Sequence, residues 1–123
     1  MSFWNGRKIL VTGGSGFIGS HLVDHLLDAG AHVRVVGRNR NHLERKIGKR
    51  ISHVDFYTGD IRDPDTAVAS CKGRDTVFHL AAQVAGAGWN SARPGTMLTQ
   101  NLALGIHMLD GAVKNDVERF LCV

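Results

Sequence analysis

A group of glycines between an apolar run and an amphipathic stretch constrains the fold of this chain more than any other feature. Residues 8–12 read KILVT, and residues 12–19 read TGGSGFIG. From Phe17 to Ala29 apolar residues recur every three or four positions, which is the pattern of a helix that buries one face. A chain that passes from strand to helix within a few residues needs backbone conformations with positive φ, and glycine adopts them without strain. The pattern therefore predicts a buried strand, a tight glycine turn and a helix.

Strand and helix patterns alternate along the rest of the chain. Further strands are expected at residues 33–36, 54–58, 76–82 and 119–123, and helices at 41–49, from 63 onward, and at 96–114. Such alternation with short loops indicates a parallel sheet with helices on both faces. Right-handed crossovers favour the doubly wound strand order 3-2-1-4-5. We therefore expect one α/β domain over residues 1–123 that stops after strand five.

Composition and charge exclude several classes of protein. A hydrophobic fraction of 43% is too high for a disordered chain, and no apolar run approaches the roughly 18 residues of a membrane helix. Cys71, expected at a helix end, and Cys122, expected in a buried strand, make no disulfide framework, so we expect a cytoplasmic protein without a membrane partner. The net charge of +4 could suit nucleic acid, but no aromatic residue interleaves with the basic cluster at residues 38–50. We expect no nucleic-acid partner, and the cluster is either a solvated helix face or, in its first members, phosphate-facing.

The glycine turn has the spacing of a phosphate-binding loop. Gly13, Gly16 and Gly19 form GxxGxxG, and Gly14 with the last two also satisfies GxGxxG. Glycines let backbone N–H groups approach a pyrophosphate, and the N-terminus of the following helix adds partial positive charge. Gly19, one turn into the helix, permits close packing of helix on strand. The sequence predicts dinucleotide binding here, and the alternative is a glycine-rich turn without a ligand.

The end of the second predicted strand bears on which dinucleotide is bound. In NAD-binding versions of this unit an acidic residue there holds the ribose 2′-hydroxyl, and the expected position is Gly37. No Asp or Glu occurs between His32 and Leu43, whereas Arg38 and Arg40 follow the strand. Because an arginine can grip a 2′-phosphate and stack on adenine, we expect NADP, with NAD as the alternative.

Four segments at suitable spacing carry a family resemblance. They are residues 3–22, which contain the glycine turn, residues 59–63 (GDIRD), residues 77–82 (VFHLAA) and residues 101–102 (NL). Together they resemble the extended short-chain dehydrogenase/reductase family of NAD-dependent epimerase/dehydratase type. The stretch 84–102 is closest in look to GDP-fucose synthases and GDP-mannose epimerases, with Gly86, Asn90, Pro94 and Asn101 in place and Ala85 where that family usually has glycine.

The resemblance implies a part for each of several residues. Around the cofactor they would be Gly13, Gly16, Phe17, Ile18 and Gly19 at the pyrophosphate, Arg38 at the 2′-phosphate, Asp60 and Ile61 at the adenine, and Ala81 and Ala82 at the nicotinamide ribose. Gly86, Trp89 and Asn90 would belong to a substrate loop, and Asn101 would support the active site. Asp60 has the alternative of capping a turn, and His79 is expected to be a packed strand residue rather than a base. We expect no metal site, because His21 and His25 have no third ligand nearby in sequence.

The catalytic residues of this family are a Ser or Thr after strand five and a Tyr-x-x-x-Lys on the next helix, where the tyrosine moves a proton and the lysine lowers its pKa. The chain's one tyrosine, Tyr57, is followed four residues later by Ile61, so no catalytic residue is assigned in this chain. The resemblance implies hydride transfer on the sugar of a nucleotide sugar, in a homodimer when full length. We expect an amino-terminal fragment without the substrate domain, which binds cofactor without turnover. The alternatives are a non-catalytic NAD(P)-binding sensor and a reductase of the same family that acts on a non-nucleotide substrate.

Overall fold

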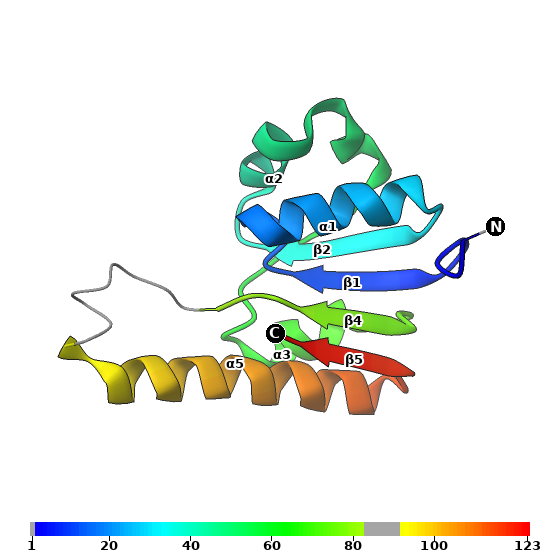
Figure 1. Cartoon of the computed structure of the whole chain (residues 1–123). Coiled ribbons are helices and arrows are strands. Elements are labelled where there is room, and N and C mark those ends of the chain that lie inside the picture. The colour runs from blue at the N-terminus through cyan, green and yellow to red at the C-terminus, as the bar shows by residue number, and fades with distance from the viewer. Residues whose placement is uncertain (1, 83–91) are drawn as a thin grey trace.

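The computed structural model describes residues 2–82 and 92–123, and a parallel sheet lies at its centre (Figure 1). Within this part of the chain the sheet has five strands: β1 (Lys8–Thr12), β2 (His32–Gly37), β3 (Asp55–Thr58), β4 (Thr76–His79) and β5 (Arg119–Cys122). They lie in the order β3-β2-β1-β4-β5, and every neighbouring pair is parallel. The expected doubly wound order is therefore confirmed.

Helices cover both faces of the sheet. They are α1 (Phe17–Asp28), α2 (Arg40–Ile47), the 3-10 helix η1 (Gly48–His53), α3 (Pro64–Ser70) and α5 (Pro94–Lys114). In Figure 1, α1 and α2 lie on one side of the strands, and α3 and α5 lie on the other. The core is split in the same way, because Ile9 and Val11 of β1 pack with α1 and α2 whereas Leu10 packs with α3 and α5. Since alternate residues of a strand point to opposite faces, the apolar run of β1 serves both layers.

Single residues explain where several helices begin and end. α1 is followed by Gly30, which takes φ 83°, a left-handed conformation that glycine adopts readily. The side chain of Asn39 caps α2 by accepting a hydrogen bond from the N–H of Asn41 at 2.9 Å. Asp63 caps α3 in the same way, by accepting from the N–H of Asp65 at 3.2 Å. These side chains satisfy N–H groups that the start of a helix leaves without an intrahelical partner.

β4 is shorter than the sequence pattern predicts. The apolar run of residues 76–82 indicates a strand over its whole length, but the strand ends at His79. Beyond it, the N–H of Leu80 donates to both the carbonyl and the side-chain oxygen of Thr12, and the N–H of Ala81 donates to the side-chain oxygen alone. A side chain on β1 therefore turns the chain out of the strand.

Two further expectations are wrong in detail. The helix expected over residues 41–49 gives way to η1 after Ile47, because Gly48 takes φ 62°, outside the α-helical region. Cys122, expected to be buried, is exposed because β5 lies at the edge of the sheet, whereas Cys71 is buried at the end of α3.

α5 packs on α3 and exposes an apolar stripe along another side. A side chain at Gly111 would lie 2.9 Å from the carbonyl oxygen of Ala67, so this glycine lets the two helices approach closely. The exposed stripe consists of Leu98, Leu102, Ile106, Leu109 and Val113. Its members recur every three or four residues and so share one face of the helix. No helix in residues 2–82 and 92–123 is long and apolar enough to cross a membrane.

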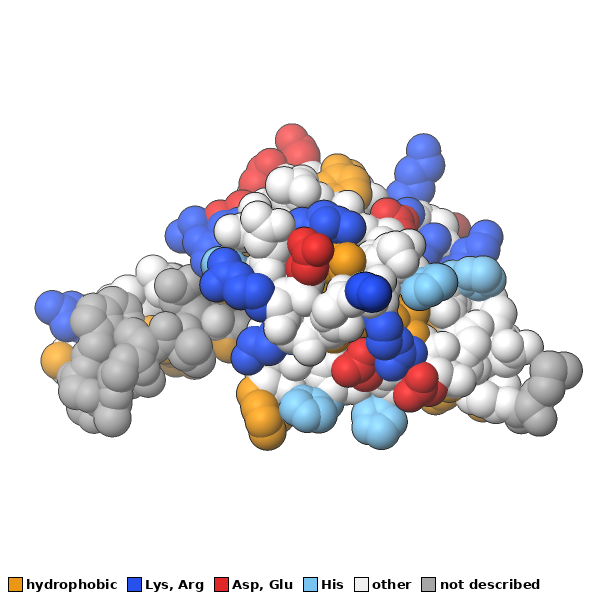
Figure 2. Space-filling view, turned by 90° about the horizontal axis from the view of Figure 1, so that it is seen from above, with side chains coloured by type: hydrophobic (Ala, Val, Ile, Leu, Met, Phe, Trp, Pro, Cys, Tyr) orange, Lys and Arg blue, Asp and Glu red, His pale blue; other side chains and the backbone are white. Residues whose placement is uncertain are grey.

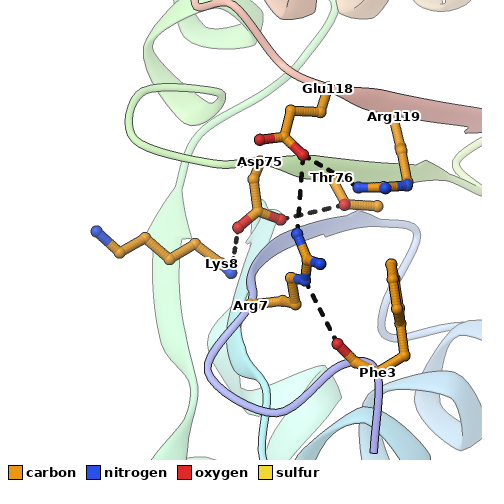
Figure 3. Close-up of polar contacts among 7 residues, drawn as sticks. All are labelled: Phe3, Arg7, Lys8, Asp75, Thr76, Glu118 and Arg119. Atoms are coloured by element: carbon orange, nitrogen blue, oxygen red, sulfur yellow. Dashed lines mark hydrogen bonds and ion pairs between the residues drawn. The ribbon is translucent and has the colours of Figure 1, made fainter.

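Polar contacts fix the amino-terminal segment to the start of β4 and β5 (Figure 3). The guanidinium of Arg7 donates to the carbonyl oxygen of Phe3 at 3.4 Å and lies 3.8 Å from the carboxylate of Glu118. The backbone N–H of Lys8 donates to the carboxylate of Asp75 at 2.9 Å. These contacts anchor the amino edge of the sheet, opposite the edge at which the glycine turn follows β1.

Candidate functional site

A groove of about 650 Å³ lies at the carboxyl edge of the sheet. Its walls come from the turns that follow β1, β2, β3 and β4. They are Gly13–Gly16, Gly37–Asn39, Gly59–Arg62 and Leu80–Ala82, together with Val36, His42 and Leu104. Open α/β sheets place ligands outside the carboxyl ends of their strands, where neighbouring connections leave toward opposite faces. β1 and β4 are such neighbours here, because α1 lies on one face and α5 on the other (Figure 1).

The glycine turn forms the side of the groove next to α1. Gly13 takes φ 71°, and a side chain on it would lie 2.8 Å from the backbone nitrogen of Ala81. A side chain at Gly19 would overlap the carbonyl oxygen of Gly13. Gly16 caps α1 without a side-chain hydrogen bond, and the first amides of a helix have no intrahelical acceptor. The turn therefore brings the chain against β4 and leaves the positive end of the α1 dipole beside the groove.

The structure brings most of the expected cofactor residues together, but not all of them. Those that line the groove are Gly13, Gly16, Arg38, Asp60, Ile61, Ala81 and Ala82. Phe17 and Ile18 are not among the lining residues, and at the start of α1 these residues are 77% and 65% exposed. Gly19 is buried beneath the turn, where it serves packing.

The two arginines that follow β2 have different surroundings. Arg38 lines the groove next to Gly37, the position at which an NAD site would have its acidic residue. Arg40 is outside the lining and pairs with Glu44 at 3.5 Å, one turn along α2. Only the first of the two is placed to meet a ligand in the groove.

The later members of the basic cluster belong to the face formed by α1 and α2. Arg50 pairs with Asp24 and Asp28 of α1 at 3.2 and 2.8 Å. Figure 2, which looks onto this face, shows Lys and Arg side chains interspersed with acidic ones. Arg50 thus belongs to a solvated, ion-paired face, whereas Arg38 lies in the lining of the groove.

Asp60 and Arg62 form a close ion pair in the wall that follows β3. Nη2 of Arg62 donates to Oδ2 of Asp60 at 2.6 Å, and the backbone N–H of Arg62 donates to Oδ1 at 2.9 Å. The side-chain hydrogen bonds from Arg62, more than the nearby charge of Arg38, hold the pKa of Asp60 below its usual value although partial burial opposes them. Asp60 thus caps the turn, as one of its expected roles requires, and also lines the groove.

Sequence reasoning missed several residues of the groove. Arg62 and His42 add polar side chains to the lining, and Val36 and Leu104 add apolar ones. Arg62 belongs to the GDIRD segment, so the family motif could have indicated it. Leu104 lies on α5, far along the chain, and no local pattern identifies it as a neighbour of the glycine turn.

A buried polar unit lies beneath the groove. Oγ1 of Thr12 accepts hydrogen bonds from the N–H groups of Leu80 and Ala81 at 3.1 and 3.0 Å. Nδ1 of His79 lies 2.7 Å from the same oxygen. The His79 side chain is 3% exposed, and burial lowers its pKa. His79 is therefore a packed strand residue, as the sequence predicts.

The expected substrate-loop residues, Gly86, Trp89 and Asn90, lie outside the described residues. Asn101 is half-buried on α5 and is not among the lining residues. Within residues 2–82 and 92–123, no group of three His, Cys, Asp or Glu side chains could hold a metal ion. The described site is therefore the groove formed by the four turns.

The known proteins that the chain resembles include nucleotide-sugar enzymes and a hydroxysteroid dehydrogenase. The chain is 31% identical over 120 residues to GDP-mannose 3,5-epimerase 1 of Oryza sativa subsp. japonica, a match that covers 96% of the chain and 31% of that protein. It is 41% identical over 75 residues to a 3 beta-hydroxysteroid dehydrogenase/Delta 5-->4-isomerase of Mycobacterium tuberculosis, with 61% of the chain and 19% of that protein covered. A double mutant of dTDP-glucose 4,6-dehydratase from Streptomyces venezuelae, solved with NAD bound, matches with a TM-score of 0.73 and 32% identity over 93% of the chain and 38% of that structure. The chain thus spans about a third of the length of the epimerase.

The family match covers the whole groove. The model of the NAD dependent epimerase/dehydratase family matches residues 9–123, which include all four turns that form the walls. The chain therefore belongs to the NAD dependent epimerase/dehydratase family.

Proposed function

We propose that this chain forms the NADP-binding part of an enzyme that acts by hydride transfer on the sugar of a nucleotide sugar. The observation that carries the proposal is the meeting of the glycine turn and Arg38 in one groove at the carboxyl edge of the sheet. The GDP-mannose epimerase and the dTDP-glucose dehydratase support a nucleotide sugar as the substrate class. The activity of the whole protein belongs to the proposal, because the chain spans about a third of the epimerase.

The glycine turn supports binding of the pyrophosphate. Gly13 and Gly16 present backbone without side chains to the groove, and the N-terminus of α1 opens beside them. The N–H of Gly16 donates to the carbonyl oxygen of Gly13, so the N–H groups offered to a phosphate are the first amides of α1, which have no intrahelical acceptor and lie at the positive end of the helix. In this arrangement the adenine would lie at Ile61 beside the Asp60–Arg62 pair.

Arg38 supports NADP over NAD. Gly37 leaves the end of β2 without a carboxylate for a 2′-hydroxyl, and a side chain there would lie 3.1 Å from the ring of Phe56. Among the described residues Arg38 makes no ion pair, whereas Arg62 is held by Asp60 at 2.6 Å. Arg38 is thus the cation that a 2′-phosphate would engage. The dehydratase structure with NAD bound keeps NAD as the alternative cofactor.

The proposal is tested by titrating the purified chain with NADP+ and NAD+ by calorimetry. The native chain should bind NADP+ more tightly. Arg38→Ala should weaken NADP+ binding about tenfold, since a charge-assisted hydrogen bond to phosphate is lost, and should leave the Kd for NAD+ nearly unchanged.

Arg40→Ala is the matched control for this experiment. It removes a neighbouring arginine that is paired with Glu44 outside the groove, so both dissociation constants should stay close to the native values. Tighter binding of NAD+ by the native chain, or equal losses in the two variants, would contradict a 2′-phosphate contact at Arg38.

The remaining parts of the proposal concern turnover, assembly and location. The chain has one tyrosine, Tyr57, which lies in β3 without a lysine four residues later, so we expect cofactor binding without turnover of a sugar. The exposed apolar stripe of α5 supports a homodimer for the whole protein. Two cysteines without a disulfide support a cytoplasmic location.

A second candidate function is oxidoreduction of a non-nucleotide substrate within the same family. It is favoured by the 41% identity over 75 residues to the steroid dehydrogenase, a higher identity than that to the epimerase over its longer match. Turnover assays of the whole protein with GDP-mannose and with a 3-hydroxysteroid distinguish the two candidates.

A further inference from the structure

The buried hydroxyl of Thr12, beneath the groove, has three hydrogen-bonding neighbours, and their chemistry indicates which atom donates and which accepts in each contact. Three groups surround Oγ1 of Thr12: the N–H of Leu80 at 3.1 Å, the N–H of Ala81 at 3.0 Å and Nδ1 of His79 at 2.7 Å. The two amides can only donate. Thr12 is fully buried and His79 nearly so, so these partners are not exchanged for bulk water.

Counting protons assigns the tautomer of His79. A threonine hydroxyl accepts two hydrogen bonds and donates one. The N–H of Ala81 uses one accepting position, and the N–H of Leu80, shared with the carbonyl oxygen of Thr12 at 3.2 Å, uses the other. The hydroxyl proton is therefore directed to Nδ1 of His79. Nδ1 is therefore unprotonated, and the neutral ring carries its proton on Nε2. The lowering of the His79 pKa by burial agrees with a neutral ring.

The direction of this hydroxyl matters for the shape of the groove. Ala81 lines the groove, and its backbone nitrogen lies where a side chain on Gly13 would come within 2.8 Å. The glycine turn and the end of β4 are thus in direct contact, and the Thr12 oxygen holds the β4 side of that contact. A hydroxyl free to rotate would offer its lone pairs to the two amides for only part of the time.

We propose that His79 is a positioning residue of the groove: its Nδ1 fixes the Thr12 hydroxyl, which in turn holds the backbone of Leu80 and Ala81 against the glycine turn. His79 itself would not touch the cofactor. The consequence for dinucleotide affinity rests on the proposed function, whereas the tautomer and the held amides do not.

The first test reads the tautomer in the native chain by nitrogen NMR of uniformly labelled protein. The expected spectrum shows a neutral His79 with an unprotonated Nδ1 and a protonated Nε2 at pH 7. A spectrum with the proton on Nδ1, or a charged ring, would overturn the proposal without any variant.

The second test compares two substitutions with the same branching at Cγ. His79→Asn keeps a hydrogen-bond acceptor at the δ position, whereas His79→Leu has none. Amide exchange of Ala81 should be roughly tenfold faster in the leucine variant than in the native chain, and the asparagine variant should recover most of the difference. Equal exchange in the two variants would contradict the positioning role.

Two substitutions at Thr12 provide an independent test if the His79→Leu variant does not fold. Thr12→Ser retains the hydroxyl and should keep Ala81 protected, whereas Thr12→Val loses it and should expose the amide to faster exchange. Unchanged exchange in the valine variant would show that the hydroxyl does not hold the amide.

Titration with NADP+ separates this inference from the proposed function. If the native chain binds and His79→Leu weakens binding about tenfold while His79→Asn restores it, both stand. If the native chain does not bind but the tautomer and exchange results are as expected, the positioning role stands and the proposed function fails. If the native chain binds and the leucine variant binds equally well, the effect on affinity is refuted.

Discussion

β1 and β5 are both apolar runs in the same parallel sheet, yet their surroundings differ completely. In β1 (Lys8–Thr12) every residue after the first is buried, whereas β5 (Arg119–Cys122) has no buried residue. β1 lies between β2 and β4 and is covered by helices on both faces, while β5 pairs with β4 at the edge. The comparison teaches that position in the sheet, rather than the hydrophobicity of the run, decides how far its residues are buried.

The same contrast divides α5 along its length. Met108 is fully buried against the core, and Ile106, two residues earlier, is 63% exposed. Both are large apolar residues of one helix. The molecule therefore has a densely packed region around β1 and its glycine turn, and an outer region of α5 and β5 that carries exposed apolar side chains.

The largest effect is expected from a substitution at Gly19, where the helix packs most closely on the glycine turn. Gly19→Ala places a methyl group on the carbonyl oxygen of Gly13, so the free energy of unfolding should fall by about 3 kcal/mol, with loss of NADP+ binding. Urea unfolding followed by circular dichroism measures the first effect, and calorimetric titration measures the second.

Gly105→Ala on α5 is the matched control in the outer region. A methyl group there meets nothing within 4 Å, so it should raise stability by about 0.5–1 kcal/mol through helix propensity. Equal destabilisation by the two substitutions would refute the difference between the regions.

An intermediate effect is expected from the two faces of α5. Met108→Ala removes a fully buried side chain and should cost about 2–4 kcal/mol of unfolding free energy. Ile106→Ala removes an exposed one and should stay within about 0.5 kcal/mol. Urea midpoints of the two variants give the comparison, and a cost at Ile106 comparable to that at Met108 would show that the stripe is covered in solution.

The smallest expected effect concerns the two cysteines. Burial raises the pKa of Cys71 from an ordinary value of 9.0 to about 11, whereas Cys122 is exposed on β5. Between these pH values the folded chain keeps the Cys71 proton and the unfolded chain releases it. The contribution to stability is therefore full below pH 9 and is lost as the pH rises toward 11.

Unfolding midpoints at pH 8 and pH 10.5 measure this loss. Cys71→Ala should reduce the difference between the two midpoints, and Cys122→Ala should leave it unchanged. At pH 8, iodoacetamide should modify Cys122 first, because little Cys71 thiolate is present and its sulfur is buried. Faster modification of Cys71 would contradict its placement in the packed region.

The sequence predicted the fold closely where local pattern and turn chemistry agreed. The strand order follows from alternation and handedness, and the end of α1 follows from Gly30, which takes positive φ. The end of β4 was not predictable in this way, because no glycine, proline or charged residue interrupts residues 76–82 (TVFHLAA), and the strand ends where Thr12 binds the amides of Leu80 and Ala81.

The candidate site was predictable to a similar degree. Arg38, Asp60 and Ala81, which the sequence assigns to a cofactor site, line the groove, while Phe17 and Ile18 are not among its lining residues. The spacing of the glycines indicates where the backbone is left uncovered by side chains, but it does not indicate in which direction the side chains of Phe17 and Ile18 point.

By itself the sequence determined the α/β architecture, the glycine turn and the residues after β2, because each depends on periodicity or on conformations that a few neighbouring residues can adopt. The tertiary structure alone decided that Arg38 faces a groove while Arg40 and Arg50 are ion-paired elsewhere, and that Leu104 joins that groove from α5. It also decided which apolar runs are buried. The burial of a side chain and its ion pairing depend on segments that are distant along the chain. A local sequence pattern does not specify which of these segments will be adjacent in the fold.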